Sequence, residues 1–333
     1  MEREVMFYEP GPDNRTDCKV CPRLCNISPG KRGFCRVREN RAGTLYATNY
    51  GECSAQALDP IEKKPLYHFH PGSLILSLGT VGCNLRCGFC QNWNIAHESP
   101  PTTYLAPERA VELARQQKEK GYPCVGLAYT YSEPFMWYEY VYDTAKLACQ
   151  AGLKNVLVTN GYISEEPLMA LLPYIDAMNI DVKAFTDEFY KTNCAGRLDP
   201  VLRTVEIASQ HCHVEITTLL VTGLNDSPEE VERLIDWLAA LDPEIPLHFS
   251  RYFPNYKMDL PPTPLQSLSR ARETALKKLR YVYIGNAPEL CASSTSCPGC
   301  GKMLIERQGY SVRAEEITGG SCPECGEKIA VVM

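Results

Sequence analysis

Apolar and polar positions follow two alternating periods through the middle of the chain. Short apolar runs typical of buried strands begin with SLILSLG at 73–79. Amphipathic stretches separate these runs, and the clearest, 107–120, has proline near its start and Gly121 just past its end. The pattern predicts strands over 73–79, 124–130, 155–159, 177–182, 214–221, 247–252 and 281–285. It predicts helices over 107–120, 135–151, 165–172, 198–211, 228–241 and 265–279.

This alternation of strands and helices indicates a parallel sheet with crossover helices, that is, an α/β fold. The number of repeats is close to six, with a possible extra strand. A doubly wound sheet and an open or partial α/β barrel both fit, and the spacing does not separate them. In either architecture the chemistry belongs at the carboxyl ends of the strands.

The composition divides the chain into a large central part and two cysteine-rich ends. A chain of 333 residues that is 44% hydrophobic and 22% charged is typical of a globular protein with one large domain and small additions. We predict an N-terminal four-cysteine module over 1–55, a catalytic domain over 56–290 and a zinc-ribbon-like module over 291–333.

The net charge of -6 and pI near 5.6 provide no basic field for nucleic acid or an anionic membrane. The N-terminal residues are polar and charged, and the sequence has no apolar run of about 18 residues or more. We therefore predict a cytoplasmic protein that uses neither a membrane nor a nucleic-acid partner.

Seventeen cysteines are too many and too clustered for ordinary core positions. Their odd number and the absence of a signal peptide argue against a disulfide scaffold, so metal or iron–sulfur ligation is the better interpretation. Three groups stand out: Cys18, Cys21, Cys25 and Cys35; Cys83, Cys87 and Cys90; and Cys297, Cys300, Cys322 and Cys325. The remaining cysteines are interpreted as small buried hydrophobic residues: Cys53, Cys124, Cys149, Cys194, Cys212 and Cys291.

The central group stands in GCNLRCGFCQNW, on a loop directly after the first predicted strand. Three thiolates can hold three irons of a 4Fe-4S cluster and leave the fourth iron open. An open iron can accept the amino and carboxylate groups of S-adenosylmethionine (SAM), whose reductive cleavage yields a 5'-deoxyadenosyl radical. The alternative is a zinc site that takes a fourth ligand such as His97.

The two outer groups suit closed metal sites. The knuckles Cys297-Pro-Gly-Cys300 and Cys322-Pro-Glu-Cys325 nearly match a zinc ribbon, which favours structural zinc over an auxiliary cluster or a rubredoxin-like iron. The N-terminal four suit zinc and a second iron–sulfur cluster equally. Basic residues near this group could offset thiolate charge, contact an acidic partner or only face solvent: Arg23, Lys31, Arg32, Arg36 and Arg38.

At the central cysteines the chain resembles the radical SAM superfamily, whose signature is CxxxCxxC after the first strand of a partial barrel. More narrowly it resembles the pyruvate formate-lyase activating enzymes, and within that branch the radical SAM enzyme of the AmmeMemoRadiSam system. Ordered segments across nearly the whole chain carry this resemblance: DPIEKKPLYHFHPG (59–72), AYTYSEP (128–134), VTNGY (158–162), NIDVKAF (179–185), VTGLND (221–226) and HFSRYFPNYKMDLPPTP (248–264). The resemblance implies a partial (β/α)6 TIM-like barrel.

The resemblance also implies contacts to the cofactor. Glu133, in TYSEP, stands in the segment that meets the SAM amino group, although the family's glycine pair is missing. Glu133 could instead be an acid at a helix start. Thr159 and Asn160 match polar contacts after the third strand, where plain turn chemistry is equally open.

Asp181 and Lys183 match the DLK pattern of the activating enzymes, and strand alternation puts both on one face, where Lys183 suits the methionine carboxylate. A surface salt bridge is the alternative. His248 is predicted to contact adenosine, substrate or only its neighbours. The activating enzymes have an acid where this chain has Val158, which puts a cation site dependent on that acid in doubt.

The family therefore implies hydrogen abstraction, from a protein as in glycyl-radical activation. Modification of a peptide, nucleoside or small molecule by the same radical is a second hypothesis, and a zinc-binding scaffold without activity is a third. The implied partners are a one-electron donor such as flavodoxin or ferredoxin and the other proteins of the AmmeMemoRadiSam system.

Overall fold

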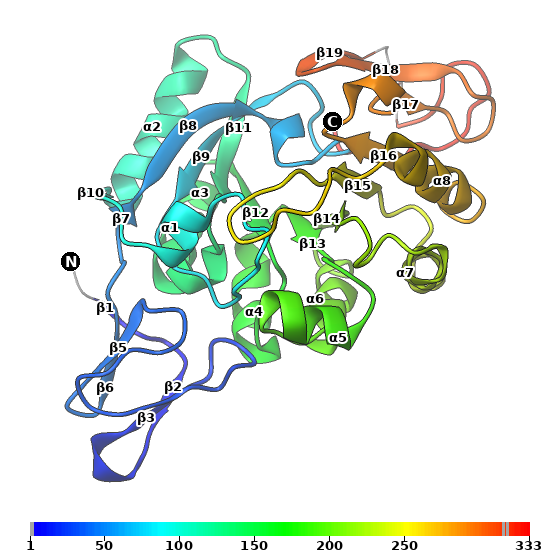
Figure 1. Cartoon of the computed structure of the whole chain (residues 1–333). Helices are drawn as coiled ribbons and strands as arrows, with labels where there is room; N and C mark the ends of the chain where they lie inside the picture. Colours follow the sequence, from blue (N-terminus) through cyan, green and yellow to red (C-terminus); the bar gives the residue numbers. More distant parts are fainter. Residues whose placement is uncertain (1–2, 315–316, 318–319) are drawn as a thin grey trace.

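The computed structural model describes residues 3–314, 317 and 320–333, and its centre is one eight-stranded sheet (Figure 1). The strands, in the order of the chain, are β8 (Ala55–Pro60), β9 (Leu74–Gly79), β11 (Cys124–Tyr129), β12 (Lys154–Thr159), β13 (Ala177–Asp181), β14 (His213–Leu220), β15 (Leu247–Arg251) and β16 (Val282–Gly285). The strands from β9 to β16 run parallel and correspond to all the predicted ones, whereas β8 is an antiparallel edge strand that the pattern did not reveal.

Neighbouring strands of this sheet follow one another in the sequence, from β8 at one edge to β16 at the other. Crossovers between parallel strands are right-handed, so a sheet that grows in one direction carries its crossover helices on one face. The order contains no reversal, which excludes the doubly wound alternative. Figure 1 shows α2, α3, α6, α7 and α8 along the outer side of the open sheet.

The predicted helices form with boundaries close to those expected. They are α2 (Pro107–Glu119), α3 (Tyr138–Gln150), α4 (Glu165–Leu171), α6 (Asp199–Ala208), α7 (Pro228–Leu241) and α8 (Leu265–Ala275). The start of α7 shows why: the Ser227 side chain accepts a hydrogen bond from the Glu230 N–H, and Pro228 occupies the first turn. The short helices α1 (Trp93–His97) and α5 (Asp187–Phe189) were not predicted.

The N-terminal region forms small antiparallel sheets, whose strands the sequence pattern did not predict. Their strands are β1 (Arg3–Glu4), β2 (Tyr8–Pro10), β3 (Thr16–Cys18), β4 (Asn26–Ile27), β5 (Arg38–Arg41), β6 (Thr44–Ala47) and β7 (Glu52–Cys53), with β7 paired to β10 (Thr103–Tyr104). Buried side chains such as Val5, Val20 and Leu45 belong to the same hydrophobic cluster as the main sheet. The region therefore packs directly on the part of the chain that forms the eight-stranded sheet.

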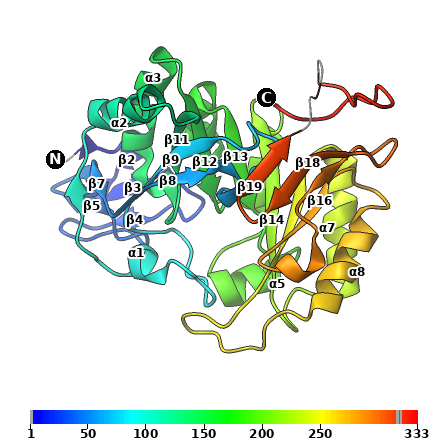
Figure 2. The same ribbon diagram turned by 90° about the horizontal axis from the view of Figure 1, so that it is seen from above.

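The C-terminal region is a three-stranded antiparallel sheet of β17 (Thr295–Ser296), β18 (Met303–Gln308) and β19 (Ser311–Ala314). It has its own small core around Leu304, Ile305 and Ile329. Figures 1 and 2 place this sheet and the N-terminal sheets at opposite ends of the molecule.

One face of the main sheet is partly covered by apolar side chains from outside the sheet. Ile61, Leu66 and Phe69, from the connection between β8 and β9, pack with Ala128 and Val156 in a separate cluster. These two sheet residues share a face with Thr130 and Val158 because side chains alternate along a strand. The carboxyl half of the same face is left for a cavity.

In the part of the chain that the structure describes, no helix has the length and apolar character needed to cross a bilayer.

Candidate functional site

A cavity of about 580 Å³ lies at the carboxyl ends of the parallel strands, within the size range of small-molecule sites. Its walls combine polar side chains from successive strands with all three central cysteines. Lining residues include Cys83, Cys87, Cys90, Thr130, Glu133, Val158, Thr159, Asn160, Asp181, Lys183, Thr217 and Ser250. The cavity therefore brings together the predicted cluster ligands and most of the predicted cofactor residues.

The cysteine loop after β9 is held from two sides by backbone hydrogen bonds. The N–H groups of Arg86 and Gly88 donate to the carbonyls of Cys194 (2.8 Å) and Asn193 (3.0 Å), at the end of the π-helical turn Tyr190–Cys194. From the other side, the N–H of Lys257 donates to the carbonyl of Gly88 at 3.0 Å. The loop is therefore fixed before any ligand binds.

The sulfur atoms of the loop face hydrogen-bond donors as well as the cavity. Cys83 Sγ accepts from Leu85 N at 3.4 Å and from Asn160 Nδ2 at 3.6 Å. The Cys87 thiol makes a hydrogen bond with the buried thiol of Cys194, which together with burial raises the pKa of Cys87 well above its usual value. Sequence reasoning treated Cys194 as a solitary core cysteine, and no local signal marks its contact with Cys87.

Glu133 is buried at the wall of the cavity, with 2% of its surface exposed. Its Oε1 accepts from Thr159 Oγ1 (2.7 Å) and Phe135 N (3.1 Å), and its Oε2 accepts from Asn160 N (2.9 Å). A carboxylate has about four acceptor positions, so one is left for a ligand. Burial raises the pKa of Glu133 to about 7 although these donors lower it. The residue caps the 3-10 helix Pro134–Trp137, as the helix-start interpretation has it, and it lines the cavity; its contact with the cofactor stays a prediction.

Thr159 and Asn160 are already engaged with protein groups. The Thr159 hydroxyl donates to Glu133 and accepts from Gly161 N at 3.1 Å. The Asn160 amide donates to Cys83 Sγ and to Asn84 Oδ1 (3.0 Å), and its carbonyl accepts from the backbone. Both residues line the cavity, but these bonds direct their polar atoms toward Glu133 and the cysteine loop.

Asp181 and Lys183 lie on one face of the sheet, as strand alternation predicts, and line the cavity together. Lys183 Nζ contacts Asp181 Oδ2 at 2.9 Å, with 13% of the lysine side chain exposed. Burial lowers the pKa of Lys183, but the Asp181 carboxylate and the nearby Cys87 and Cys194 thiols outweigh it and raise the pKa well above its usual value. The cavity therefore holds a permanent cation opposite the cysteine loop.

His248 lies apart from the other predicted cofactor residues. It is 3% exposed, and its Nε2 lies 2.6 Å from Oε2 of the buried Glu215. Its ring contacts those of Tyr67 and Tyr283, at 4.7 and 5.2 Å between centroids. His248 is the second residue of β15 and so lies near the amino end of this strand, whereas the cavity lies at the carboxyl ends. His248 does not line the cavity. His248 is thus surrounded by neighbouring side chains, and its contact with the cofactor stays a prediction.

The zinc alternative for the central group required a fourth ligand such as His97. The His97 ring packs against Tyr256, with 5.6 Å between the centroids, and it does not line the cavity. Burial together with the charges of Arg86 and Arg36 lowers the pKa of His97 to about 4. This position does not support a fourth ligand from His97.

Two parts of the cavity wall were missed by sequence reasoning. Asp59 Oδ2 accepts from Lys64 Nζ (2.7 Å) and from the Tyr131 hydroxyl (2.6 Å), and both of these donors belong to residues that line the cavity. Tyr131 has φ of 69°, an uncommon conformation for a residue with a side chain. Tyr310, in the turn between β18 and β19, also lines the cavity, although it is far away in the sequence. Asp59 and Lys64 stand in segment 59–72, one of the segments that carry the family resemblance, and this could have pointed to them. No sequence signal pointed to Tyr310.

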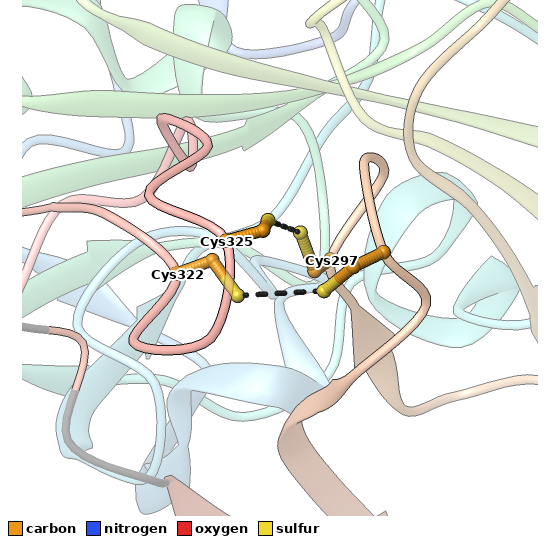
Figure 3. A group of neighbouring side chains, drawn as sticks. Cys297, Cys322 and Cys325 are labelled. Carbon is orange, nitrogen blue, oxygen red and sulfur yellow. Dashed lines mark hydrogen bonds between the residues drawn. The ribbon is translucent and has the colours of Figure 1, made fainter.

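The C-terminal cysteines form a compact group (Figure 3). Their sulfur atoms lie within 4.8 Å of one another, with Cys297 Sγ 3.5 Å from Cys325 Sγ and Cys300 Sγ 3.7 Å from Cys322 Sγ. Burial raises the pKa of Cys297, but backbone N–H groups and the neighbouring thiols outweigh it and bring the pKa to about 7. Four converging thiols of this kind can bind a metal ion.

The N-terminal cysteines also meet, around a second and smaller enclosed cavity. Cys18, Cys21, Cys25 and Cys35 all line it. Burial raises the pKa of Cys18 to about 12 and also raises the pKa of Cys35. Neutral thiols are therefore favoured there until a cation displaces their protons.

Comparison with known proteins gives the family. The model of the Radical SAM superfamily matches residues 77–238. The uncharacterized protein MJ0808 of Methanocaldococcus jannaschii is 46% identical over 340 residues, covering 99% of this chain and all of the relative. The pyruvate formate-lyase-activating enzyme of Clostridium pasteurianum is 29% identical over 159 residues, or 46% of this chain and 64% of that enzyme. Streptococcus suis SuiB bound to S-adenosylmethionine has TM-score 0.53 at 15% identity, covering 74% of this chain and 60% of SuiB.

The chain belongs to the radical SAM superfamily, and members of its activating-enzyme branch are among its relatives. This family implies a 4Fe-4S cluster and SAM. The residues present fit both groups. Three thiols line a cavity of sufficient size, one of them already accepts N–H groups at sulfur, and Glu133 and Lys183 offer a carboxylate and an ammonium group to an amino acid.

Proposed function

We propose that this protein binds a 4Fe-4S cluster through Cys83, Cys87 and Cys90 and cleaves SAM reductively, so that the 5'-deoxyadenosyl radical abstracts hydrogen from a protein substrate. The observation that carries the proposal is that the three thiols, Glu133 and Lys183 all line the same cavity. Bound SAM on the reduced cluster supplies the radical; the chain supplies ligation, orientation and exclusion of water.

The residues of the cavity suit the two ends of the methionine moiety. Glu133 accepts from an amino group, with Thr159 and the Asn160 N–H holding its carboxylate in place. Lys183 offers its ammonium group to a carboxylate, while Asp181 holds it at 2.9 Å. Asn160 donates to Cys83 Sγ, an arrangement that lowers electron density on a ligand sulfur.

The loop between β15 and α8 shields the cysteine loop from solvent. Besides the Lys257 bond to Gly88, Tyr256 of this loop stacks on Trp93, with 5.3 Å between the ring centroids. Its path across the front of the sheet is visible in Figure 1. A covered loop protects a radical site from water and from competing hydrogen donors.

A protein substrate is supported by the relative named as a pyruvate formate-lyase-activating enzyme. The resemblance to the AmmeMemoRadiSam radical enzyme adds the other proteins of that system as partners, and a ferredoxin or flavodoxin as the one-electron donor.

We also propose that the open sheet curves as a partial barrel, with metal modules at 1–55 and 291–333. A cytoplasmic location agrees with clustered cysteines kept reduced for metal binding.

Anaerobic reconstitution with iron and sulfide, followed by dithionite and SAM, tests the activity. We expect visible charge-transfer absorption and formation of 5'-deoxyadenosine. A colourless protein that contains zinc and forms no 5'-deoxyadenosine would refute the enzyme and support the scaffold hypothesis. Hydrogen transfer from deuterated candidate substrates into 5'-deoxyadenosine then separates a protein substrate from small ones.

The affinity for SAM is expected to fall as the pH is lowered through about 7. Burial raises the pKa of Glu133 to about 7 in the free protein, and an amino-group donor favours its carboxylate form, so binding lowers this pKa. The contribution is complete above pH 7 and decreases at most about tenfold per unit below it. Other charges near Glu133 are Lys183, which stays protonated, and Cys83, which a cluster holds as thiolate. Equilibrium dialysis from pH 6 to 8 measures this; a flat profile contradicts the role of Glu133.

Replacement of Cys322 by serine is expected to remove one zinc ion per chain and leave the iron content unchanged. The four sulfur atoms are placed for a single tetrahedral ion, and loss of that ion should lower the melting temperature of the C-terminal sheet. The matched control is Cys291→Ser, since Cys291 is an exposed cysteine outside the group. Elemental analysis and thermal scanning measure both effects. Loss of iron instead of zinc would show that this site holds a cluster.

A further inference from the structure

The enclosed N-terminal cavity has the character of a buried ligand site. Cys18, Cys21 and Cys35 are each 7% exposed. The remaining wall is largely apolar, with Val20, Ile27 and Met136 among its residues. Four thiols gathered in a cavity of this kind exclude water, unlike the C-terminal group, in which two cysteines are exposed.

Arg38 provides an independent sign that the cavity takes an anionic group. This arginine lines the cavity with 1% of its surface exposed. Its Nη1 pairs with the buried Glu139, but its Nε and Nη2 have no hydrogen-bond partner among the described residues. Arg38 therefore brings buried N–H groups without a partner into the wall of the cavity that the four cysteines line. A buried N–H group without an acceptor lowers the free energy of unfolding. We therefore infer that metal-bound thiolates accept hydrogen bonds from the Arg38 N–H groups.

The spacing of the sulfur atoms distinguishes between the possible metals. A tetrahedral zinc ion with Zn–S near 2.3 Å separates sulfur atoms by about 3.8 Å. Among the residues that the structure describes, only the C-terminal cysteines gather this closely. The N-terminal four and the central three have a wider spread, as expected when several irons separate the ligands. The N-terminal sulfur atoms are therefore not gathered as closely as a single tetrahedral zinc ion requires.

The N-terminal site shares its wall with the cysteine loop of the catalytic cavity. Asn84, which directly follows Cys83, lines the N-terminal cavity, and its carbonyl accepts from Arg23 Nε at 2.5 Å. A Cβ atom on Gly82 would stand 2.9 Å from the carbonyl oxygen of Cys35, so only glycine allows this approach. The residues on both sides of Cys83 thus contact the N-terminal cysteine group or the wall of its cavity.

We propose that Cys18, Cys21, Cys25 and Cys35 bind a second iron–sulfur cluster, a redox centre beside the central one, instead of a structural zinc ion. The identity of the neighbouring centre rests on the proposed function, but the metal at the N-terminal site does not. Four thiolates close this site completely, so it has no open position for SAM.

The test uses the full chain with the central ligands removed, Cys83→Ala/Cys87→Ala/Cys90→Ala, reconstituted anaerobically with iron, sulfide and zinc. We expect at least about two irons per chain with matching sulfide, about one zinc, and an electron paramagnetic resonance signal after reduction. Absence of iron, with about two zincs or with the N-terminal site empty, would overturn the proposal. This result does not depend on SAM cleavage, so failure of the proposed activity would be seen separately in the wild-type protein.

A further substitution tests whether the iron that remains in the triple variant is bound by the N-terminal cysteines. Adding Cys21→Ser to that triple variant should remove the iron and sulfide and leave the zinc. Cys53→Ser in the same background is the matched control, because Cys53 is a buried cysteine nearby that does not line the cavity. Iron retained by the Cys21→Ser variant would contradict the assignment. If this variant fails to fold, the metal content of the triple variant decides alone.

Discussion

Replacement of Cys87 by alanine is expected to abolish formation of 5'-deoxyadenosine and to remove about four irons per chain. Cys87 is buried at the cavity wall, in the middle of the trio, and the loop holds no fourth cysteine to replace its thiolate. With two ligands left, the cluster is lost, and SAM has no iron to bind. The loss of activity should exceed about 100-fold.

Metal analysis, visible absorption and quantification of 5'-deoxyadenosine measure this outcome. The matched control is Cys124→Ala, because Cys124 is a buried cysteine of β11 that does not line the cavity. The control should keep its iron and its activity, with only a moderate loss of stability. A Cys87→Ala variant that still forms 5'-deoxyadenosine would show that the central cysteines are not the cluster ligands.

The second large effect is expected for Glu133→Gln. The carboxylate uses both oxygens to accept hydrogen bonds, so an amide NH2 at Oε2 would face the Asn160 N–H, donor against donor. Loss of a charge-assisted bond to the SAM amino group should weaken binding about 10- to 100-fold. The unsatisfied buried donors should also lower the free energy of unfolding by about 1–3 kcal/mol.

A control separates the two consequences of this change. Glu230 is a buried glutamate of α7 whose carboxylate accepts from Phe185 N at 2.7 Å, and it does not line the cavity. Glu230→Gln should lower stability but leave the KM for SAM unchanged, whereas Glu133→Gln should raise it. Equal KM values for Glu133→Gln and the wild type would show that Glu133 does not contact SAM and only caps the helix.

Much of the fold follows from local patterns. The apolar runs and amphipathic stretches predicted the parallel strands and their helices because buried strands and one-sided helices have distinct periods. The edge strand β8 escaped prediction because its residues, AQALDP, mix apolar and polar side chains without a clear period. Strand order could not be predicted, since it depends on which strands pair in space.

The candidate site was predictable in part for similar reasons. Cys83, Cys87 and Cys90 are recognisable because three thiolates closely spaced on one loop can ligate one cluster, and Asp181 and Lys183 because alternation sets their common face. The sequence did not show that His248 lies outside the cavity wall, because the depth of a side chain in the sheet depends on tertiary packing. Tyr310 and Cys194 were missed because their roles depend on contacts between segments that are distant in the chain.

The sequence by itself indicated the chemistry that we propose for this protein, because the spacing of three cysteines along one loop allows them to share a cluster. It also determined the α/β class, through periodicity. Only the tertiary structure decided which polar groups meet those thiolates, since side chains from separate strands converge at one sheet edge. The same packing places the N-terminal cysteines against the catalytic loop, through Asn84 and Gly82, a contact between segments that no local pattern encodes.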